Sequence, residues 1–460
     1  MKGKNRRRLF GTDGIRGIAN QYPMTLEVAV AVGRALTLWL QRHNISHPKI
    51  LIGKDTRQSG YLFEMALTSG VVSTGGDVLL AGVMPTPGIA YLTSGMLAHA
   101  GVMISASHNP ADNNGIKIFD EEGYKLPDKS EEEIEKLICD LNLTESVVQP
   151  QQIGRVRRVP DATGRYIAHL KESFPRNYSL DGIKIVVDCS NGASYRVGPM
   201  VFDELGGDVI PVSIGPNGRN INLNCGTLHP DLISKEVLRH KADLGITFDG
   251  DADRVILCDH EGNIVDGDQI MAICALDMKK KGKLQHDTIV STIMSNIGFE
   301  MAMNEAGIKV IRADVGDRYV IETMKKGGYG FGGEQSGHII FYKYCTTGDG
   351  LMGAIQVLRN MVEQKKSLKE LSSCMNRHPQ VLESVEVREK IPFEKIENVI
   401  KVIRAVEDKL GSKGRVLVRY SGTESLARVM VEGENLEEIT RYTKDIVAAI
   451  QSSIGKGVNA

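Results

Sequence analysis

The sequence predicts an α/β protein made of three α/β domains followed by a C-terminal α+β domain. Its 460 residues correspond to about three or four domains at roughly 150 residues each. Apolar segments of strand length alternate with helical segments through residue 375, which favours α/β units. Residues 376–460 lose this alternation and instead group three strands with two helices.

The predicted elements follow one another in a regular order. Thr25 can cap a helix that continues to Gln41, and the apolar run from Lys49 to Gly53 then predicts a buried strand. Because strand and helix alternate, the sheets should be largely parallel. Further strands are expected at 78–83, 101–105, 183–188, 208–212, 244–248, 289–293 and 308–312. Further helices are expected near 61–74, 194–206, 232–241, 297–306 and 316–326. In the last domain we expect strands at 381–388, 414–419 and 427–433, and helices at 394–410 and 435–453.

Polar stretches mark the expected domain boundaries. The segment from Thr144 to Arg158 follows a charged helix at 130–141 and contains Pro150 among glutamines, so it predicts a linker. Further breaks are expected after the strand that ends near Asp259 and at 376–379. The predicted domains are therefore residues 1–155, 156–260, 261–375 and 376–460.

Charge and cysteine content narrow the classes of partner. The 56 Lys and Arg residues nearly balance the 57 Asp and Glu residues, so no strong positive field attracts nucleic acid or an acidic membrane. The seven cysteines are odd in number and form no C-x-x-C pair, which argues against a disulfide framework and a thiolate zinc site. No apolar run of about 18 residues occurs in the sequence. We therefore expect a soluble cytoplasmic protein that holds any anionic ligand with local Arg and Lys side chains.

Three aspartates, Asp249, Asp251 and Asp253, alternate with small residues directly after an apolar strand. This spacing lets three carboxylates face one point, where their repulsion is costly unless a cation neutralises it. Hard oxygen ligands favour Mg²⁺ or Mn²⁺. An EF-hand loop is excluded, because Arg254 stands where that loop requires glycine and His260 where it requires glutamate. The alternative is a solvated acidic turn.

The segment ISASHNP at 104–110 also follows an apolar strand, and Pro110 then breaks regular structure. Ser107 would lie at the carboxyl end of the strand, where open α/β sheets bind ligands. Adjacency does not make Ser107 and His108 a catalytic pair, because neighbouring side chains on an extended chain point apart. A structural serine or Asx turn explains the segment equally well.

Two other loops have the composition of phosphate sites. Gly11 to Gly17 is a glycine-punctuated loop that includes Arg16, although a plain turn is as good an interpretation. A second loop follows a strand near Arg419 and supplies hydroxyl, backbone N–H and guanidinium donors, with a structural turn again as the alternative. The loop reads Arg419-Tyr420-Ser421-Gly422-Thr423-Glu424, and Arg428 follows it.

Nucleotide-binding motifs are excluded. Gly328, Gly330 and Gly333 match G-x-G-x-x-G, but an apolar strand follows instead of the required helix. The phosphate loop G-x-x-x-x-G-K-[ST] does not occur. The loops therefore indicate phosphate chemistry without a nucleoside triphosphate donor.

Five motifs in order resemble the α-D-phosphohexomutase superfamily, and within it the phosphoglucosamine mutase branch. They are GTDGIRG at 11, SASHNP at 105, FDGDADR at 248, GEQSGH at 333 and RYSGTES at 419. The resemblance covers nearly the whole chain. It implies an isomerase with three related α/β domains of mixed sheets and a C-terminal α+β domain around a central cleft, each domain lending one loop.

The resemblance also implies roles for individual residues. Ser107 would carry the phosphoryl group, and a phosphate oxygen on Ser107 would bind Mg²⁺ together with Asp249, Asp251 and Asp253. The sugar would contact Glu334, Ser336 and His338. The phosphate that does not react would be bound by Arg419, Ser421, Gly422, Thr423 and Arg428. Positions near the reacting phosphoryl group, with the general acid or base left open, are Arg16, His108, Lys117 and Arg254.

The implied reaction interconverts glucosamine 6-phosphate and glucosamine 1-phosphate through a phosphoserine enzyme and a 1,6-bisphosphate intermediate. Gln335 is typical of the glucosamine branch, whose product feeds amino-sugar and peptidoglycan precursor synthesis. Glucosamine or glucose 1,6-bisphosphate would act as activator, the partner would be a small-molecule sugar phosphate, and the protein would be a monomer or homodimer. The alternatives are a phosphomannomutase/phosphoglucomutase and a non-catalytic sugar-phosphate-binding protein.

Two departures from this branch bear on the loops. Ala252 stands where glycine is more usual, and its methyl group is tolerable at a negative φ and unfavourable at a positive one. Tyr420 and Ser425 stand where prolines are usual, which predicts a looser phosphate loop.

Overall fold

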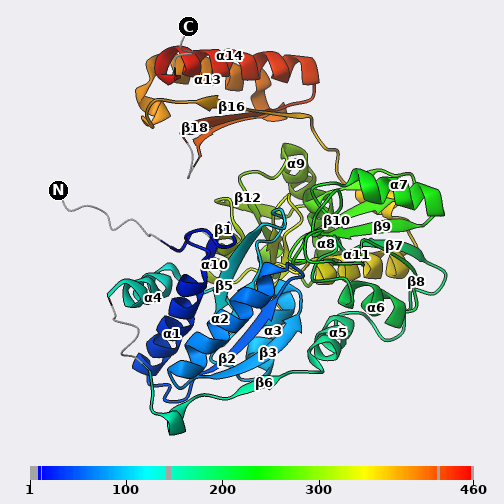
Figure 1. Ribbon diagram of the computed structural model, residues 1–460. Helices are drawn as coiled ribbons and strands as arrows, with labels where there is room; N and C mark the ends of the chain where they lie inside the picture. Colours follow the sequence, from blue (N-terminus) through cyan, green and yellow to red (C-terminus); the bar gives the residue numbers. More distant parts are fainter. Residues whose placement is uncertain (1–8, 12, 141–146, 422–424, 457–460) are drawn as a thin grey trace. The chain divides into compact units, whose positions relative to one another are not determined.

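The structure, a computed structural model, describes residues 9–11, 13–140, 147–421 and 425–456 (Figure 1). Two compact units divide the chain. Unit 1 comprises Met1–Ile293 and Ile308–Ser373, and unit 2 comprises Met294–Gly307 and Cys374–Ala460. The three predicted boundaries between the four domains stay a prediction.

The first sheet of unit 1 has six strands in the order β1-β5-β4-β2-β3-β6. Its strands are β1 (Ile15–Ile18), β2 (Lys49–Lys54), β3 (Asp77–Val83), β4 (Ala100–Ile104), β5 (Asn113–Phe119) and β6 (Val156–Arg158). The accompanying helices are α1 (Leu26–Arg42), α2 (Ser59–Ser73), α3 (Thr86–Gly95) and α4 (Asp128–Asp140). The Thr25 hydroxyl caps α1 by accepting a hydrogen bond from the Val28 amide at 3.3 Å. Helices α1 and α2 meet closely at Gly70, where a Cβ would lie 2.3 Å from the Val30 carbonyl oxygen.

Two further sheets in unit 1 have the strand orders β11-β10-β9-β7-β8 and β13-β12-β14-β15. The strands of the first are β7 (Lys184–Asp188), β8 (Asp208–Val212), β9 (Leu244–Phe248), β10 (Val255–Asp259) and β11 (Ile264–Val265). The strands of the second are β12 (Thr288–Thr292), β13 (Lys309–Ala313), β14 (Phe331–Gly333) and β15 (Ile339–Phe341). Their helices are α5 (Ala162–Glu172), α6 (Val197–Glu204), α7 (Asp231–His240), α8 (Gly267–Lys280), α10 (Asp317–Gly327), α11 (Gly350–Gln364) and α12 (Leu368–Ser372).

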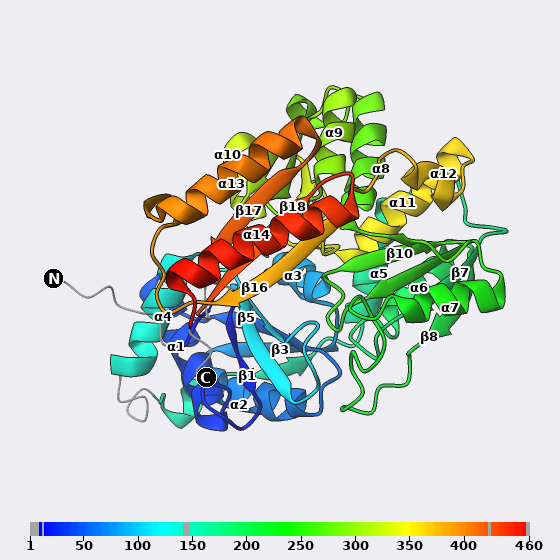
Figure 2. The ribbon, with the colours of Figure 1, turned by 90° about the horizontal axis from the view of Figure 1, so that it is seen from above.

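Unit 2 contains an antiparallel sheet in the order β16-β18-β17. Its elements are α9 (Ile297–Glu305), β16 (Gln380–Glu386), α13 (Glu397–Leu410), β17 (Arg415–Tyr420), β18 (Leu426–Glu432) and α14 (Leu436–Ile454). Helices α13 and α14 lie side by side across one face of the sheet (Figure 2). Val429 and Val431 of the sheet and Ile446 and Ile450 of α14 are buried in the core between them.

All three sheets of unit 1 are mixed, and the antiparallel part occupies the same place in each. Strands β4, β9 and β14 each pair in parallel with one neighbour and in antiparallel with the next strand along the chain, which is β5, β10 or β15. The connections in these hairpins are residues 105–112, 249–254 and 334–338. They contain three of the loops that the sequence analysis singled out. A fourth, which follows Arg419, lies between β17 and β18 of unit 2.

The predicted fold class is confirmed, and every expected strand and helix occurs close to its expected range. The expectation of largely parallel sheets missed the antiparallel hairpins. Two expectations about loops are wrong as well. Strand β6 lies inside the predicted linker and pairs with β3, and it escaped prediction because its three side chains are exposed and show no apolar period. Strand β1 begins inside the expected glycine-punctuated loop and pairs with β5.

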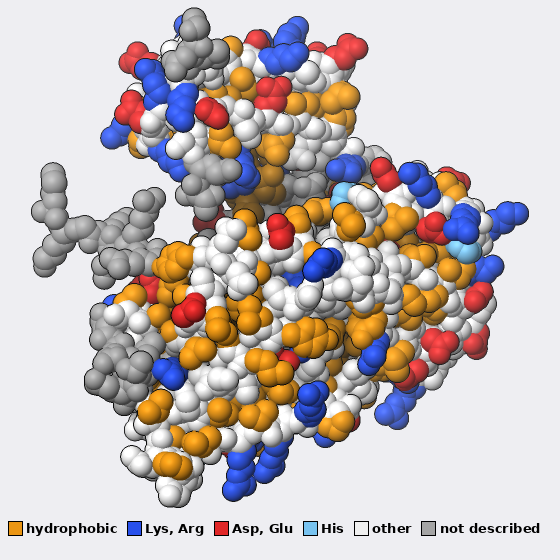
Figure 3. Space-filling view, in the orientation of Figure 1, with side chains coloured by type: hydrophobic (Ala, Val, Ile, Leu, Met, Phe, Trp, Pro, Cys, Tyr) orange, Lys and Arg blue, Asp and Glu red, His pale blue; other side chains and the backbone are white. Residues whose placement is uncertain are grey.

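The surface of unit 1 mixes hydrophobic side chains with charged and other polar ones on the face that Figure 3 shows. Within the described residues, no helix combines the length and the apolar character that crossing a membrane requires. None of the seven cysteines, all of which lie in the described part of the chain, forms a disulfide, and five of them are buried.

Candidate active site

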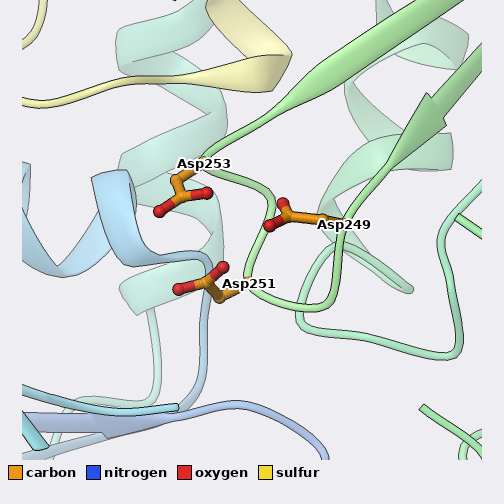
Figure 4. Close-up of side chains that lie close together, drawn as sticks. All are labelled: Asp249, Asp251 and Asp253. Atoms are coloured by element: carbon orange, nitrogen blue, oxygen red, sulfur yellow. The ribbon is translucent and has the colours of Figure 1, made fainter. Parts of the chain in front are cut away.

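Asp249, Asp251 and Asp253 lie in the β9–β10 connection and are all buried. One carboxylate oxygen of each lies within 4.8 Å of the others, and the three side chains point toward a common space (Figure 4). Burial, with the charges of Asp253 and Asp251, raises the pKa of Asp249 well above its ordinary value. Burial acts the same way on Asp251, but Lys117 and a hydrogen bond from Thr86 outweigh it and lower that pKa.

This cluster fits a divalent cation. Asp251 Oδ1 and Asp253 Oδ1 are buried, and neither has a hydrogen-bond partner among the described residues. Buried carboxylate oxygens without partners are costly, and a hard cation would satisfy them. The loop is held in place from α3, where the Thr86 hydroxyl donates to Asp251 Oδ2 at 2.6 Å and the Thr86 amide to the Asp251 carbonyl at 2.9 Å. The solvated acidic turn does not fit this burial.

Ser107 lies in the β4–β5 connection and reaches the aspartate loop. Its hydroxyl donates to Asp249 Oδ2 at 2.6 Å, although the two residues are 142 positions apart in sequence. Its backbone is left-handed, with φ +52°. The expectation that the side chains of Ser107 and His108 point apart is therefore wrong, because this conformation brings His108 Nδ1 to 3.3 Å from Ser107 Oγ. Burial, and then the charges of Arg254 and Arg16, lower the pKa of His108 to about 4, so its ring is neutral at neutral pH.

Cationic side chains surround the two loops. Lys117 Nζ on β5 lies 2.9 Å from Asp251 Oδ2, 3.3 Å from Asp253 Oδ2 and 3.5 Å from Asp13 Oδ2. Burial lowers the pKa of Lys117, but these three carboxylates outweigh burial and raise it above the ordinary value. Arg16 on β1 pairs with Asp13. Arg254 donates its amide to Asp249 Oδ1 at 3.2 Å, and its Nε lies 4.0 Å from Asp253 Oδ1.

The β14–β15 connection adds Glu334, Ser336 and His338 to this side of unit 1. The Glu334 amide donates to the His338 carbonyl at 2.9 Å, which closes the loop. Glu334 Oε1 accepts from the Gly316 amide at 2.9 Å, and Ser336 Oγ lies 3.5 Å from Glu334 Oε2. His338 Nδ1 lies 3.9 Å from Asp253 Oδ1. The third loop therefore meets the aspartate loop through His338.

The predicted phosphate clamp lies in unit 2. Arg419 and Arg428 are register partners on β17 and β18, and burial with the charge of Arg428 lowers the pKa of Arg419. Like charges placed opposite each other on a sheet favour an anion between them. Tyr420 stacks on Phe393 with ring centroids 4.2 Å apart and donates its hydroxyl to the Ile391 carbonyl. Ser421 is buried, whereas Gly422 and Thr423 lie outside the described residues.

Sequence reasoning missed three charged residues that link these loops. Lys125 pairs with both Asp13 and Asp317, and Asp317 Oδ2 lies 3.3 Å from His338 Nε2. The result is a chain of alternating charge that runs from Arg16 to His338 in the β14–β15 connection. Asp13 had a signal, since a carboxylate inside a glycine-rich segment near Arg16 is conspicuous. Lys125 and Asp317 stand in no local pattern of charge, so only the fold brings them together.

Ala252, between Asp251 and Asp253, has φ +56° and is fully buried. Ala252 therefore has the positive φ that was expected to be unfavourable for a residue with a Cβ methyl group. The Ala252 carbonyl accepts a hydrogen bond from the Gly350 amide at 3.1 Å, which helps to hold it there.

Comparisons with known proteins match nearly the whole chain to one family. Models of the four phosphoglucomutase/phosphomannomutase domains match in order: alpha/beta/alpha domain I over 7–144, domain II over 164–262, domain III over 266–378 and the C-terminal domain over 382–449. The fold is similar to a phosphoglucomutase/phosphomannomutase family protein from Burkholderia thailandensis, with TM-score 0.81 and 20% identity over 97% and 99% of the two chains. It is also similar to Aspergillus fumigatus N-acetylphosphoglucosamine mutase in complex with GlcNAc-6P and magnesium, with TM-score 0.68 and 17% identity over 97% and 96%.

Two curated relatives are much more similar in sequence. The phosphoglucosamine mutase of Geobacter metallireducens is 53% identical over 449 residues, which cover 98% of this chain and 99% of the relative. The phosphoglucosamine mutase of Syntrophotalea carbinolica is 51% identical over 450 residues, or 98% of each chain. These matches confirm the resemblance drawn from the five motifs. The chain therefore belongs to the phosphoglucosamine mutase family, whose members are phosphohexomutases of the isomerase class.

Proposed function

We propose that this protein interconverts glucosamine 6-phosphate and glucosamine 1-phosphate, with Ser107 as the residue that carries the phosphoryl group. The observation that carries the proposal is the 2.6 Å contact between Ser107 Oγ and Asp249 Oδ2 inside a buried aspartate cluster. Phosphoryl transfer depends on in-line positioning and on neutralisation of charge more than on covalent help from the protein. A buried hydroxyl beside an acidic cluster and several cations meets both needs.

Asp249, Asp251 and Asp253, with a phosphate oxygen on Ser107, would hold Mg²⁺. When bound, this ion would neutralise part of the negative charge on the phosphoryl group. The unpartnered oxygens of Asp251 and Asp253 support this assignment, as does magnesium in the complex of the Aspergillus fumigatus enzyme. Arg16, Lys117 and Arg254 supply the remaining positive charge around Ser107, and His108 lies within hydrogen-bond reach of its hydroxyl.

The reaction has two transfers. Phosphorylated Ser107 gives its phosphoryl group to O1 of the 6-phosphosugar, which makes glucosamine 1,6-bisphosphate. After the bisphosphate reorients, Ser107 takes the phosphoryl group from O6, which leaves the 1-phosphate and restores the phosphoenzyme. Glucosamine or glucose 1,6-bisphosphate would therefore also act as activator by phosphorylating Ser107.

The other loops would bind the parts of the substrate that do not react. Glu334, Ser336 and His338 would contact sugar hydroxyls, and the hydrogen bond from Gly316 holds Glu334 in position. Arg419 and Arg428, with Ser421 and the neighbouring Gly422 and Thr423, would bind either phosphate in alternate halves of the cycle. Each of the four predicted domains, 1–155, 156–260, 261–375 and 376–460, would lend one of these loops.

Two measurements test the proposal. Intact mass spectrometry of the purified protein should show one added phosphate, and peptide mapping should place it on Ser107. The kcat/KM for glucosamine 6-phosphate should exceed those for glucose 6-phosphate and mannose 6-phosphate, as the names of the relatives and Gln335 in the sugar loop favour. A preference for a neutral hexose would support the phosphomannomutase/phosphoglucomutase alternative instead, and binding without turnover of any of the three would indicate a sugar-phosphate-binding protein.

A further inference from the structure

The backbone of Ser107 is held on both sides by side chains that lie away from the reacting groups. Its carbonyl oxygen accepts hydrogen bonds from Arg57 Nη2 at 2.8 Å and from Asn222 Nδ2 at 2.9 Å. Its amide donates to Ser105 Oγ at 2.9 Å. Gly250 packs closely against the same carbonyl group, since a Cβ at position 250 would lie 2.5 Å from the carbonyl oxygen of Ser107. Both peptide groups of Ser107 are thus fixed.

Arg57 provides the first of the two side-chain hydrogen bonds to the Ser107 carbonyl. Its side chain is fully buried, and its Nε donates to Asp55 Oδ2 at 2.8 Å. The same guanidinium group donates to the carbonyl oxygens of Asn109 at 2.9 Å and Asn113 at 3.0 Å. Asp55 Oδ2 also accepts from Ser105 Oγ at 2.7 Å, so one buried ion pair supports the loop from both ends. The planar guanidinium group has five N–H donors, so it can bind Asp55 and several carbonyl oxygens at once, and the ammonium group of a lysine could not replace it.

Asn222 provides the second side-chain hydrogen bond to the Ser107 carbonyl. It lies in the part of unit 1 that carries the aspartate loop. Its Nδ2 donates to the Ser107 carbonyl and, at 3.1 Å, to the Asn109 carbonyl. Its own backbone is left-handed, with φ +59°, and its amide donates to the Ser190 carbonyl at 2.9 Å. Asparagine is among the few residues that adopt this conformation readily.

We propose that Arg57 and Asn222 are positioning residues that hold Ser107 in its left-handed conformation, and so aim its hydroxyl at Asp249. A serine at φ +52° is strained, and such strain persists only where the surroundings over-determine it. The conformation turns Oγ toward Asp249 and brings His108 beside it. Neither Arg57 nor Asn222 touches the reacting atoms, because both act through the Ser107 carbonyl. This inference rests on the proposed role of Ser107.

The test uses Asn222→Asp and Asn222→Gly in the full-length enzyme. Both residues tolerate a positive φ, so the backbone at 222 stays as it is. Aspartate turns an acceptor toward the two carbonyl oxygens, and glycine removes the donor. Arg219→Ala is the matched control: Arg219 Nε donates to Gln58 Oε1 at 2.9 Å between the same two regions of unit 1, is exposed, and does not contact the Ser107 loop.

We expect Asn222→Asp to lower kcat by about 100-fold, because a misplacement of about 1 Å costs roughly that much. Asn222→Gly should lower it less, since Arg57 remains. The KM for glucosamine 6-phosphate should stay that of Arg219→Ala, whose kcat should equal that of the wild type. The rate at which phosphorylated enzyme loses its phosphate to glucosamine 6-phosphate in a single turnover should fall in parallel with kcat.

Wild-type kcat in both Asn222 variants would overturn the inference. So would a loss of kcat that is matched by Arg219→Ala, because it would mean that the contact only packs two parts of unit 1 together. If Asn222→Asp does not fold, Asn222→Gly decides between these outcomes. Phosphate mapping separates this inference from the proposed function. Wild-type enzyme without phosphate on Ser107 would contradict the proposed function. Asn222 variants that carry the phosphate and keep the wild-type kcat would contradict only the positioning role of Arg57 and Asn222.

Discussion

Replacing Ser107 by alanine should lower kcat by about 10³-fold or more, since loss of a residue that carries the transferred group removes the covalent route altogether. The measurement is the rate of glucosamine 1-phosphate formation in the presence of Mg²⁺ and bisphosphate activator. Affinity for glucosamine 1,6-bisphosphate, measured by calorimetry, should change much less, because the residues proposed to bind the sugar hydroxyls and the other phosphate remain. Intact mass spectrometry should show no added phosphate.

Alanine at position 107 must also adopt the left-handed conformation that Ser107 has. Ser107→Gly provides the control, because glycine takes this conformation without strain. Equal inactivity of the two variants would assign the loss to the hydroxyl group. Activity of Ser107→Ala within about tenfold of the wild type would take the phosphoryl group away from this residue, because tenfold is the effect of only about 1.4 kcal/mol.

The second large effect concerns stability. Lys117→Met should lower the free energy of unfolding by about 3–5 kcal/mol in EDTA, the usual cost of breaking a buried ion pair from one side. Lys117 is buried and lies within 3.5 Å of carboxylate oxygens of Asp13, Asp251 and Asp253. Without its charge, these carboxylates repel one another. The measurement is the midpoint of urea unfolding followed by fluorescence.

Mg²⁺ should partly rescue this variant. A divalent cation bound by Asp251 and Asp253 would take over some of the missing positive charge, so added MgCl₂ should raise the urea midpoint of Lys117→Met more than that of the wild type. Lys171→Met is the matched control, since Lys171 forms an exposed pair with Glu204 at 2.7 Å that is worth less than about 1 kcal/mol. A Lys117→Met midpoint equal to that of Lys171→Met would show that the aspartate cluster does not depend on Lys117.

The sequence predicts those parts of the fold that have a clear hydrophobic signal. Strands β2 and β9 are runs of buried residues, so their positions follow from composition and length. The loops after β4 and β9 could then be located, since polar residues directly follow each strand. Strand β6 could not be found, because exposed residues at the edge of a sheet carry no apolar pattern.

The contacts within the site were harder to predict. The proximity of His108 to Ser107 depends on a positive φ at a serine, which no local rule indicates. The pairing of Lys125 with Asp317 joins residues 192 positions apart, and neither stands in a pattern of charge that marks it. Such long-range pairs arise from the packing of several sheets, and one sequence read locally does not contain them.

The path of the chain has a consequence for the C-terminal part. Because α9 belongs to unit 2 while β12 and β13 on either side of it belong to unit 1, the polypeptide passes between the units three times, at 293–294, 307–308 and 373–374. Glu432 of β18 is fully buried and accepts hydrogen bonds from the Ile297 amide at 3.2 Å and Asn296 Nδ2 at 3.3 Å. Truncation at Ser373 would therefore strip the start of α9 of its acceptor. The last domain is therefore not a separable module. Transferring it to a relative would require moving both stretches of unit 2, Met294–Gly307 and Cys374–Ala460, together.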